Sequence, residues 1–235
     1  MFKPDPVIET ISIGGRPLCH VIDNALLEPE RWVELAVANR QAFRESSNNA
    51  FPGPELTLPE EVLGRLDAFF SRYLRQRFDV RRTLSRTARL SLALRQPADL
   101  HPQQSMCHVD RLSIEPGQLA VASVLYLFHD ESLGGTGFYR PLRPLEEVMR
   151  MKQDANALPA AEFAARHGLQ PGYMTASNPW FEKIASVPAR WNRLIFYSGM
   201  VFHSGDITAP ERLCDDPRTG RLTLNGFFTC RRNVA

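Results

Sequence analysis

The sequence predicts a mainly β protein with flanking helices, an α+β arrangement, and three stretches carry this prediction. Leucine occupies every second position from 90 to 94, residues 119–128 form an unbroken apolar run rich in β-forming types, and residues 221–229 again alternate with a period of two. A length of 235 residues suits one large domain. No internal repeat or break in composition divides the chain, so we expect a single domain over residues 1–235.

The chain is predicted to open with a β-hairpin followed by a helix. Residues 7–23 alternate isoleucines with polar neighbours and contain Gly14-Gly15, the kind of dipeptide that closes a hairpin. Residues 28–43 then place apolar side chains at helical intervals.

A second helix is predicted from the apolar series in residues 62–74. It follows Thr57-x-x-Glu60, which has the spacing of a helix capping box. We therefore expect residues 1–88 to form a hairpin and bracing helices around a core that spans residues 89–230.

The predicted core contains a further strand, residues 193–197, and a long insertion before it, residues 141–182. Residues 144–152 and 159–167 within the insertion have helical character, and Gly168 ends the second of them. Long connections inside a compact β-domain are usually functional, for example as a lid.

Bulk charge and cysteine placement exclude several classes of protein. The formal charge is only +2, and the longest apolar run is well short of the roughly 18 residues that a membrane-spanning helix needs. The first residues have no signal-peptide pattern, so we expect a cytoplasmic protein with no membrane partner. No C-x-x-C pair occurs, which favours reduced thiols over a disulfide framework or zinc knuckle. The four cysteines are Cys19, Cys107, Cys214 and Cys230.

Residues 72–95 form a basic block with eight arginines and a single acid, Asp79. A nucleic-acid groove is one interpretation. The favoured interpretation is a solvated helix end and strand edge whose arginines pair with acids elsewhere, because after Tyr73 and Phe78 no aromatic residues interleave the arginines as base-stacking platforms.

Two histidines and one aspartate are the candidate metal ligands. In an extended strand, His108 and Asp110 project from the same face toward one ion. His203 lies where the strand beginning near residue 193 should have ended, which suits a third ligand. Two histidines and a carboxylate form the facial set that holds Fe(II) and leaves positions open. The similar pair His129-x-Glu131 lies in a polar turn, and we assign His129 to a solvated loop.

Several short motifs then follow one another in a recognisable order. They are His108-x-Asp110, Leu125-Tyr126-Leu127, Gly134-Gly135-Thr136-Gly137-Phe138-Tyr139, Leu194-Ile195-Phe196-Tyr197 leading to His203, and Arg221-Leu222-Thr223. This order resembles the Fe(II)/2-oxoglutarate-dependent dioxygenases, especially the branch similar to prolyl 4-hydroxylases. It is also similar to a bacterial group of uncharacterised oxygenase-like proteins with the same Gly-Gly-Thr-x-Phe-Tyr-Arg string. The resemblance covers about residues 89–230.

The resemblance implies a double-stranded β-helix, a jelly-roll or cupin-like barrel, with Fe(II) at its open mouth. Its metal ligands, which would also be its catalytic residues, are then His108, Asp110 and His203. The residues implied to bind 2-oxoglutarate are Arg221, Thr223 and Tyr126.

The basic residue that binds 2-oxoglutarate lies at a different distance from the last histidine than is usual in the family. It usually follows the last histidine by around ten residues, whereas Arg221 follows His203 by 18 and Arg212 by nine. Arg221 is preferred because it begins an alternating strand, whereas Arg212 lies in the loop 210–220. A guanidinium grips a carboxylate through paired hydrogen bonds, so burial of Arg221 would imply an anion. A solvent-facing edge strand is the alternative.

The implied activity is hydroxylation or desaturation of a small metabolite or an amino-acid or peptide side chain. Asp110 favours these outcomes over halogenation, because related halogenases lack the carboxylate. Arg140, Trp180 and Phe181 are candidate substrate contacts. A nucleic-acid dealkylase is disfavoured, since Phe227 stands where that branch has a second arginine. Two alternatives stay open: a non-catalytic jelly-roll protein that binds an anionic small molecule or a metal, and cupin-type iron chemistry without 2-oxoglutarate.

Overall fold

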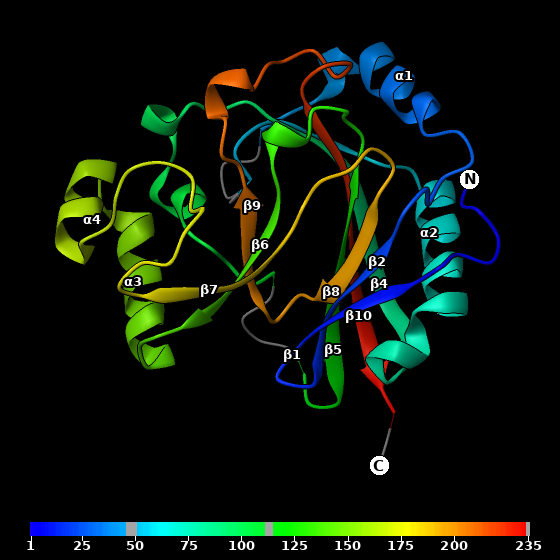
Figure 1. Cartoon of the computed structure of the whole chain (residues 1–235), viewed down its shortest axis with the longest axis horizontal. Coiled ribbons are helices and arrows are strands. Elements are labelled where there is room, and N and C mark those ends of the chain that lie inside the picture. The colour runs from blue at the N-terminus through cyan, green and yellow to red at the C-terminus, as the bar shows by residue number, and fades with distance from the viewer. Residues whose placement is uncertain (46–50, 111–114, 234–235) are drawn as a thin grey trace.

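Two antiparallel sheets dominate the computed structural model, which describes residues 1–45, 51–110 and 115–233 (Figure 1). The larger sheet has seven strands in the order β1-β2-β8-β5-β10-β4-β3, and the smaller has three in the order β7-β6-β9. The strands are β1 (Glu9–Ile13), β2 (Arg16–Ile22), β3 (Glu55–Thr57), β4 (Val80–Ala93), β5 (Gln118–Tyr126), β6 (Gly135–Pro141), β7 (Phe181–Val187), β8 (Leu194–Ser198), β9 (Phe202–Asp206) and β10 (Arg221–Arg232). The α-helices are α1 (Glu30–Ala38), α2 (Glu60–Tyr73), α3 (Leu145–Ala157) and α4 (Ala160–His167).

Helix α2 covers the outer face of the larger sheet (Figure 1). Its side chains at helical spacing, including Leu66 and Phe70, are fully buried against the sheet. The Phe70 ring stacks on Phe228 of β10 with centroids 4.7 Å apart and lies 5.8 Å from Phe196 of β8. Apolar burial at this contact holds the helix to the sheet.

The space between the two sheets contains a second apolar cluster, and a third lies beyond the smaller sheet. Tyr126, Phe138 and Tyr197 belong to the cluster between the sheets. On the far side of β6, β7 and β9, helices α3 and α4 contribute side chains such as Met151 and Phe163 to the third cluster. The molecule therefore has a layer of helices outside each sheet (Figure 1).

The predicted hairpin is confirmed as β1 and β2, with positive φ at both turn glycines, Gly14 and Gly15. Strand β2 also pairs with β8, so the hairpin extends the larger sheet. The helices expected in residues 144–152 and 159–167 are present as α3 and α4. Gly168 ends α4 in the left-handed region at φ 62°, which glycine adopts without strain.

Two local predictions were wrong. Thr57 does not belong to a capping box, because it ends β3, and no side chain caps the start of α2 after Pro59. Strand β4 begins at Val80, nine residues before the predicted start at 89, since its first half is mostly exposed and does not alternate apolar with polar residues.

No helix in the described part of the chain is long and apolar enough to cross a membrane. All four cysteines are free thiols. Cys19, Cys107 and Cys230 are buried, and Cys214 is half-buried.

Candidate metal centre

The backbone brings the two predicted histidine segments together. His108 and His203 form an isolated antiparallel bridge in which each backbone N–H donates to the other's carbonyl oxygen at 2.8 Å. The Asp110 N–H donates to the Gly199 carbonyl, also at 2.8 Å. His203 belongs to β9, so the segment that carries His108 and Asp110 is attached to the edge of the smaller sheet.

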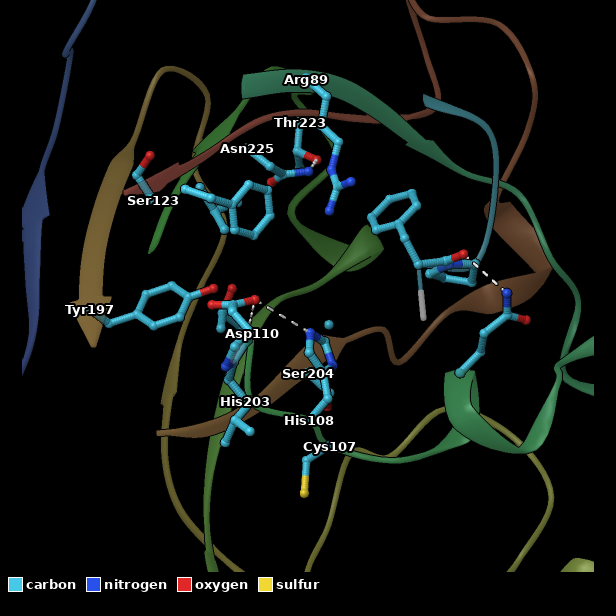
Figure 2. Close-up of a pocket in the computed structure, with 18 of the residues that line it drawn as sticks. Arg89, Cys107, His108, Asp110, Ser123, Tyr197, His203, Ser204, Thr223 and Asn225 are labelled. Carbon is cyan, nitrogen blue, oxygen red and sulfur yellow. Dashed lines mark hydrogen bonds and ion pairs between the residues drawn. The ribbon is translucent and has the colours of Figure 1, made fainter. Parts of the chain in front are cut away.

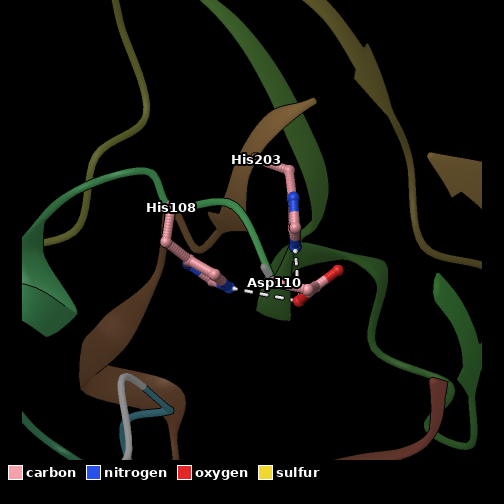
Figure 3. A group of neighbouring side chains, drawn as sticks. All are labelled: His108, Asp110 and His203. Atoms are coloured by element: carbon pink, nitrogen blue, oxygen red, sulfur yellow. Dashed lines mark ion pairs between the residues drawn. The ribbon is translucent and has the colours of Figure 1, made fainter. Parts of the chain in front are cut away.

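The side chains of these three residues converge on one point (Figure 3). One ligand atom from each lies within 4.8 Å of the others. Asp110 Oδ1 is 3.9 Å from His108 Nε2 and 3.6 Å from His203 Nε2, and the two imidazole centroids are 4.5 Å apart.

The protonation of the imidazoles suits metal binding. His203 Nδ1 donates a hydrogen bond to the Val201 carbonyl oxygen at 2.8 Å, so Nε2 is the ring nitrogen that faces Asp110 and is left for a metal ion. Burial is the main cause that lowers the pKa of His108, and His203 lowers it further, so His108 is neutral at physiological pH. Burial is the largest single influence on the pKa of Asp110 and raises it, but the interactions with His203, His108 and Arg89 together outweigh burial, so the pKa is lowered.

One oxygen of the Asp110 carboxylate is buried without a hydrogen-bond partner, which bears on whether a cation fits between the three residues. Asp110 Oδ2 is inaccessible and accepts no hydrogen bond from the described residues. Leaving a buried carboxylate oxygen unpaired is costly, and a bound cation removes that cost. Gly199 gives the carboxylate its space, because a Cβ there would lie 2.8 Å from Oδ2. The donor set and the orphaned oxygen both fit a divalent metal ion.

The three side chains line a cavity of about 590 Å³ between the sheets. Figure 2 shows the Tyr197 hydroxyl directed toward Asp110, while Arg89, Thr223 and Asn225 occupy the opposite wall. Tyr197 packs edge-on against His203 with centroids 4.7 Å apart.

Arg221 is buried at the cavity wall at the start of β10. Its Nε donates to the Leu133 and Gly134 carbonyls at 3.0 and 3.2 Å, and Nη2 donates to the Gly135 carbonyl at 2.9 Å. These acceptors satisfy hydrogen bonds but carry no net charge. Nη1 has no hydrogen-bond partner among the described residues, and burial lowers the pKa of the guanidinium.

The other residues expected around 2-oxoglutarate are held in polar networks. Thr223 lines the cavity and accepts a hydrogen bond from Asn225 Nδ2 at 3.1 Å. Tyr126 is fully buried, and its hydroxyl lies 2.7 Å from Thr136 Oγ1, which does line the cavity. Tyr126 therefore reaches the cavity wall only through Thr136.

Arg212, the alternative to Arg221, and His129, the alternative metal ligand, both lie outside the cavity lining. Arg212 is exposed and pairs with Asp130 at 2.7 Å. His129 is exposed in the turn after β5, as expected, and stacks on Trp191. In the insertion, Arg140 forms an exposed ion pair with Glu182, and Phe181 is buried in the third cluster.

Sequence reasoning missed three residues of the cavity wall, Arg89, Tyr197 and Lys152. Arg89 belongs to the basic block, which was interpreted as solvated and paired. That interpretation is confirmed for Arg86 and Arg95, which pair with acids. The alternation of the strand places Arg89 on the same face as Ser91, but the sequence does not show that this face meets the cavity.

Taken together, these features define a two-sheet β protein with a candidate mononuclear metal centre of two histidines and a carboxylate. The profile of a family described as "Family of unknown function (DUF6445)" matches residues 4–228. The chain belongs to this family.

No curated protein matches the sequence. Among solved structures, a prolyl-4-hydroxylase from Pseudomonas putida is similar, with 12% identity, 92% of this chain and 93% of that chain covered, and a TM-score of 0.44. The alpha-ketoglutarate-dependent non-heme epimerase SnoN of nogalamycin biosynthesis has 12% identity, coverages of 92% and 80%, and a TM-score of 0.47. HygX from Streptomyces hygroscopicus, solved with nickel and 2-oxoglutarate, has 13% identity, coverages of 92% and 83%, and a TM-score of 0.45.

Proposed function

We propose that this protein is an Fe(II)- and 2-oxoglutarate-dependent oxygenase with a double-stranded β-helix core. Its substrate is a small metabolite or an amino-acid or peptide side chain, and the product is an alcohol or an alkene. The observation that carries the proposal is the convergence of His108, Asp110 and His203 beside a cavity, with Asp110 Oδ2 buried and unpaired.

In this proposal the chain holds the metal through two imidazole nitrogens and one carboxylate oxygen, a ligand set that suits Fe(II). When bound, Fe(II) together with 2-oxoglutarate and dioxygen supplies the oxidation of a substrate C–H bond, with succinate and carbon dioxide as co-products. The protein orients the ligands: the Val201 carbonyl selects the His203 tautomer, and the Gly199 carbonyl anchors the Asp110 backbone.

Arg221 is the proposed anchor for the distal carboxylate of 2-oxoglutarate. Its charge is buried and its hydrogen bonds to the described residues go to neutral carbonyls, with Asp206 close enough to interact electrostatically, so an anion at Nη1 would stabilise it further. Thr223, on the same face of β10, supplies a neighbouring hydroxyl. We assign Tyr126 to hold Thr136 in place at this wall. Arg212 is set aside because it is exposed and already paired.

The test combines the full-length protein with Fe(II) and 2-oxoglutarate without oxygen, then admits oxygen and measures succinate. We expect a weak visible metal-to-ligand absorption that disappears in His108→Ala, and succinate release that requires Fe(II). Arg221→Ala should raise the apparent KM for 2-oxoglutarate, whereas the control Arg212→Ala should leave it unchanged.

The remaining outcomes decide between the alternatives. Metal binding that persists while turnover is indifferent to Arg221→Ala would indicate cupin-type chemistry without 2-oxoglutarate. Absence of both absorption and succinate in the wild-type protein would contradict the enzyme and leave a binding protein for an anionic small molecule.

A further inference from the structure

Arg89 lies on β4, the strand beside the edge strand β3 of the larger sheet, and faces the cavity. Its strand β4 pairs with β10 so that Arg89 is opposite Asn225, and the two side chains line the same wall. In Figure 2 the guanidinium extends into the cavity from the side opposite His108, Asp110 and His203. The side chain is 38% exposed, and this exposure includes the cavity.

Two neighbours hold the guanidinium in position. Its Cζ lies 4.6 Å from the centroid of the Phe227 ring, a cation–π contact that fixes one face. Glu55 Oε1 forms an ion pair with Nε at 2.9 Å and also accepts a hydrogen bond from Ser91 Oγ at 2.9 Å. Nη1 and Nη2 have no hydrogen-bond partner among the described residues. This terminal edge is the one that binds a carboxylate through two parallel hydrogen bonds.

The charges along the cavity wall favour an anionic occupant. Arg86 is satisfied by Glu60 and Asp67, which leaves Arg89, Lys152 and Arg221 as the other cations that the described lining contributes. The anions of that lining are Glu55 and Asp110.

Lys152 adds to this positive potential. It has no carboxylate partner among the described residues, and its Nζ lies 5.6 Å from the centroid of the Phe202 ring. Burial lowers the pKa of its ammonium group, more than the nearby Cys107 raises it. A metal ion at the candidate centre would increase the positive charge further, so one 2-oxoglutarate at Arg221 still leaves the cavity with a net positive charge.

We propose that Arg89 binds a carboxylate of the substrate and thereby orients it toward the candidate metal centre, which makes carboxylate-bearing molecules the substrate class. This inference rests on the proposed oxygenase function. The apolar surfaces of Phe227 and Val124 in the same cavity receive the organic part of the substrate. Because Glu55 and Phe227 already orient the guanidinium, less conformational entropy is lost when the carboxylate binds.

The test measures binding by isothermal titration to the full-length protein loaded with Mn(II) and 2-oxoglutarate. The probes are 3-phenylpropionate and its uncharged amide, 3-phenylpropionamide, which differ only in the group that Arg89 would recognise. We expect the wild-type protein to bind the acid at least tenfold more tightly than the amide. Arg89→Gln should abolish this preference. Arg89→Lys should retain only part of it, because an ammonium lacks the paired donors.

Arg82→Gln is the matched control, since Arg82 is exposed on the same strand. It should preserve the preference, and all variants should keep the wild-type affinities for Mn(II) and 2-oxoglutarate. The proposal is overturned if Arg89→Gln keeps the preference for the acid, or if the wild-type protein binds neither probe or both equally. It is also overturned if Arg89→Gln weakens 2-oxoglutarate instead, since Arg89 would then be the co-substrate anchor. Failure of the proposed function is seen separately, as Mn(II) affinity that does not depend on His108.

Discussion

Among single residues, Gly199 shows how closely the backbone surrounds the candidate ligands. Its carbonyl accepts the Asp110 N–H, and its missing side chain leaves room for the Asp110 carboxylate. An added Cβ would lie 2.8 Å from Oδ2 and 3.3 Å from the Cβ of Ala120. One of these groups would have to move, and the carboxylate is the more mobile.

We therefore expect Gly199→Ala to weaken Mn(II) binding by about tenfold or more, a loss of roughly 1.4 kcal/mol. Electron paramagnetic resonance titration of free Mn(II) measures this affinity. Gly64→Ala is the control, because a Cβ at that position in α2 meets nothing within 4 Å. Equal Mn(II) affinities in Gly199→Ala and the wild type would show that the carboxylate position does not matter for binding.

Thiol reactivity should follow burial at the four cysteines. Burial raises the pKa of Cys19 to about 12 and that of Cys230 to about 11, and it raises that of Cys107 still further. Because the thiolate is the reactive form, these three thiols should resist modification in the folded protein. A disulfide reagent should label one thiol, Cys214, in the native state and four after denaturation. Rapid native labelling of Cys107 would mean that the segment beside His108 opens readily.

At the scale of elements, the sequence predicts the strands that carry apolar residues better than those that carry charge. Residues 119–128 and 221–229 correspond to β5 and β10 because burial on at least one face leaves a pattern. The first half of β4 lacks this pattern because Arg81 and Arg82 are exposed and Arg86 is paired with acids distant in the sequence, Glu60 and Asp67. Local sequence does not contain those pairings.

Contacts between distant residues also limit how much of the candidate metal centre can be predicted from the sequence. His108 and Asp110 are neighbours and can be proposed together, but the bridge to His203 joins residues 95 positions apart, and His203 was predicted only from its place after a strand and from motif order. The cavity-facing direction of Arg89 depends on which face of β4 meets the smaller sheet. Pairing and layer order decide that direction, and they become visible only in the fold.

Strand β2 contains a histidine that should make the hairpin attachment sensitive to acid. His20 is 3% exposed, contacts Thr10 Oγ1 through Nδ1 at 3.0 Å and packs edge-on against Phe78. Burial first, and the charge of Arg77 second, lower the pKa of His20 to about 4 from an ordinary value of 6.5.

Between these two pKa values the unfolded chain binds a proton at His20 that the folded chain does not. The free energy of unfolding should therefore fall as pH decreases from about 6.5 to 4. Urea unfolding at several pH values measures the slope, with His20→Gln as the comparison. The variant should show a smaller pH dependence over this window. Parallel curves for the two proteins would mean that His20 is protonated without loss of structure.

At the scale of the whole molecule, the two sheets face each other with helices outside them (Figure 1), and the space between the sheets contains the cavity. The candidate ligands come from β9 and from the segment before β5, so a bound metal would connect parts of the chain that are distant in sequence. Ligands that bind only the folded state stabilise it by mass action.

A divalent metal at one hundred times its dissociation constant should then stabilise the fold by about 2.7 kcal/mol. For a chain of this size, that gain corresponds to a rise in melting temperature of roughly 5–10 °C. Differential scanning calorimetry with Mn(II) measures it. Asp110→Asn should remove most of the shift, and an identical shift in this variant would place the binding elsewhere.

The most direct measurement of the central claim is anomalous diffraction at the iron edge from crystals grown without oxygen in Fe(II). The account requires an iron peak bonded to the imidazoles of residues 108 and 203 and to the carboxylate of residue 110. A peak ligated by other side chains, or none at full Fe(II) loading, would contradict it.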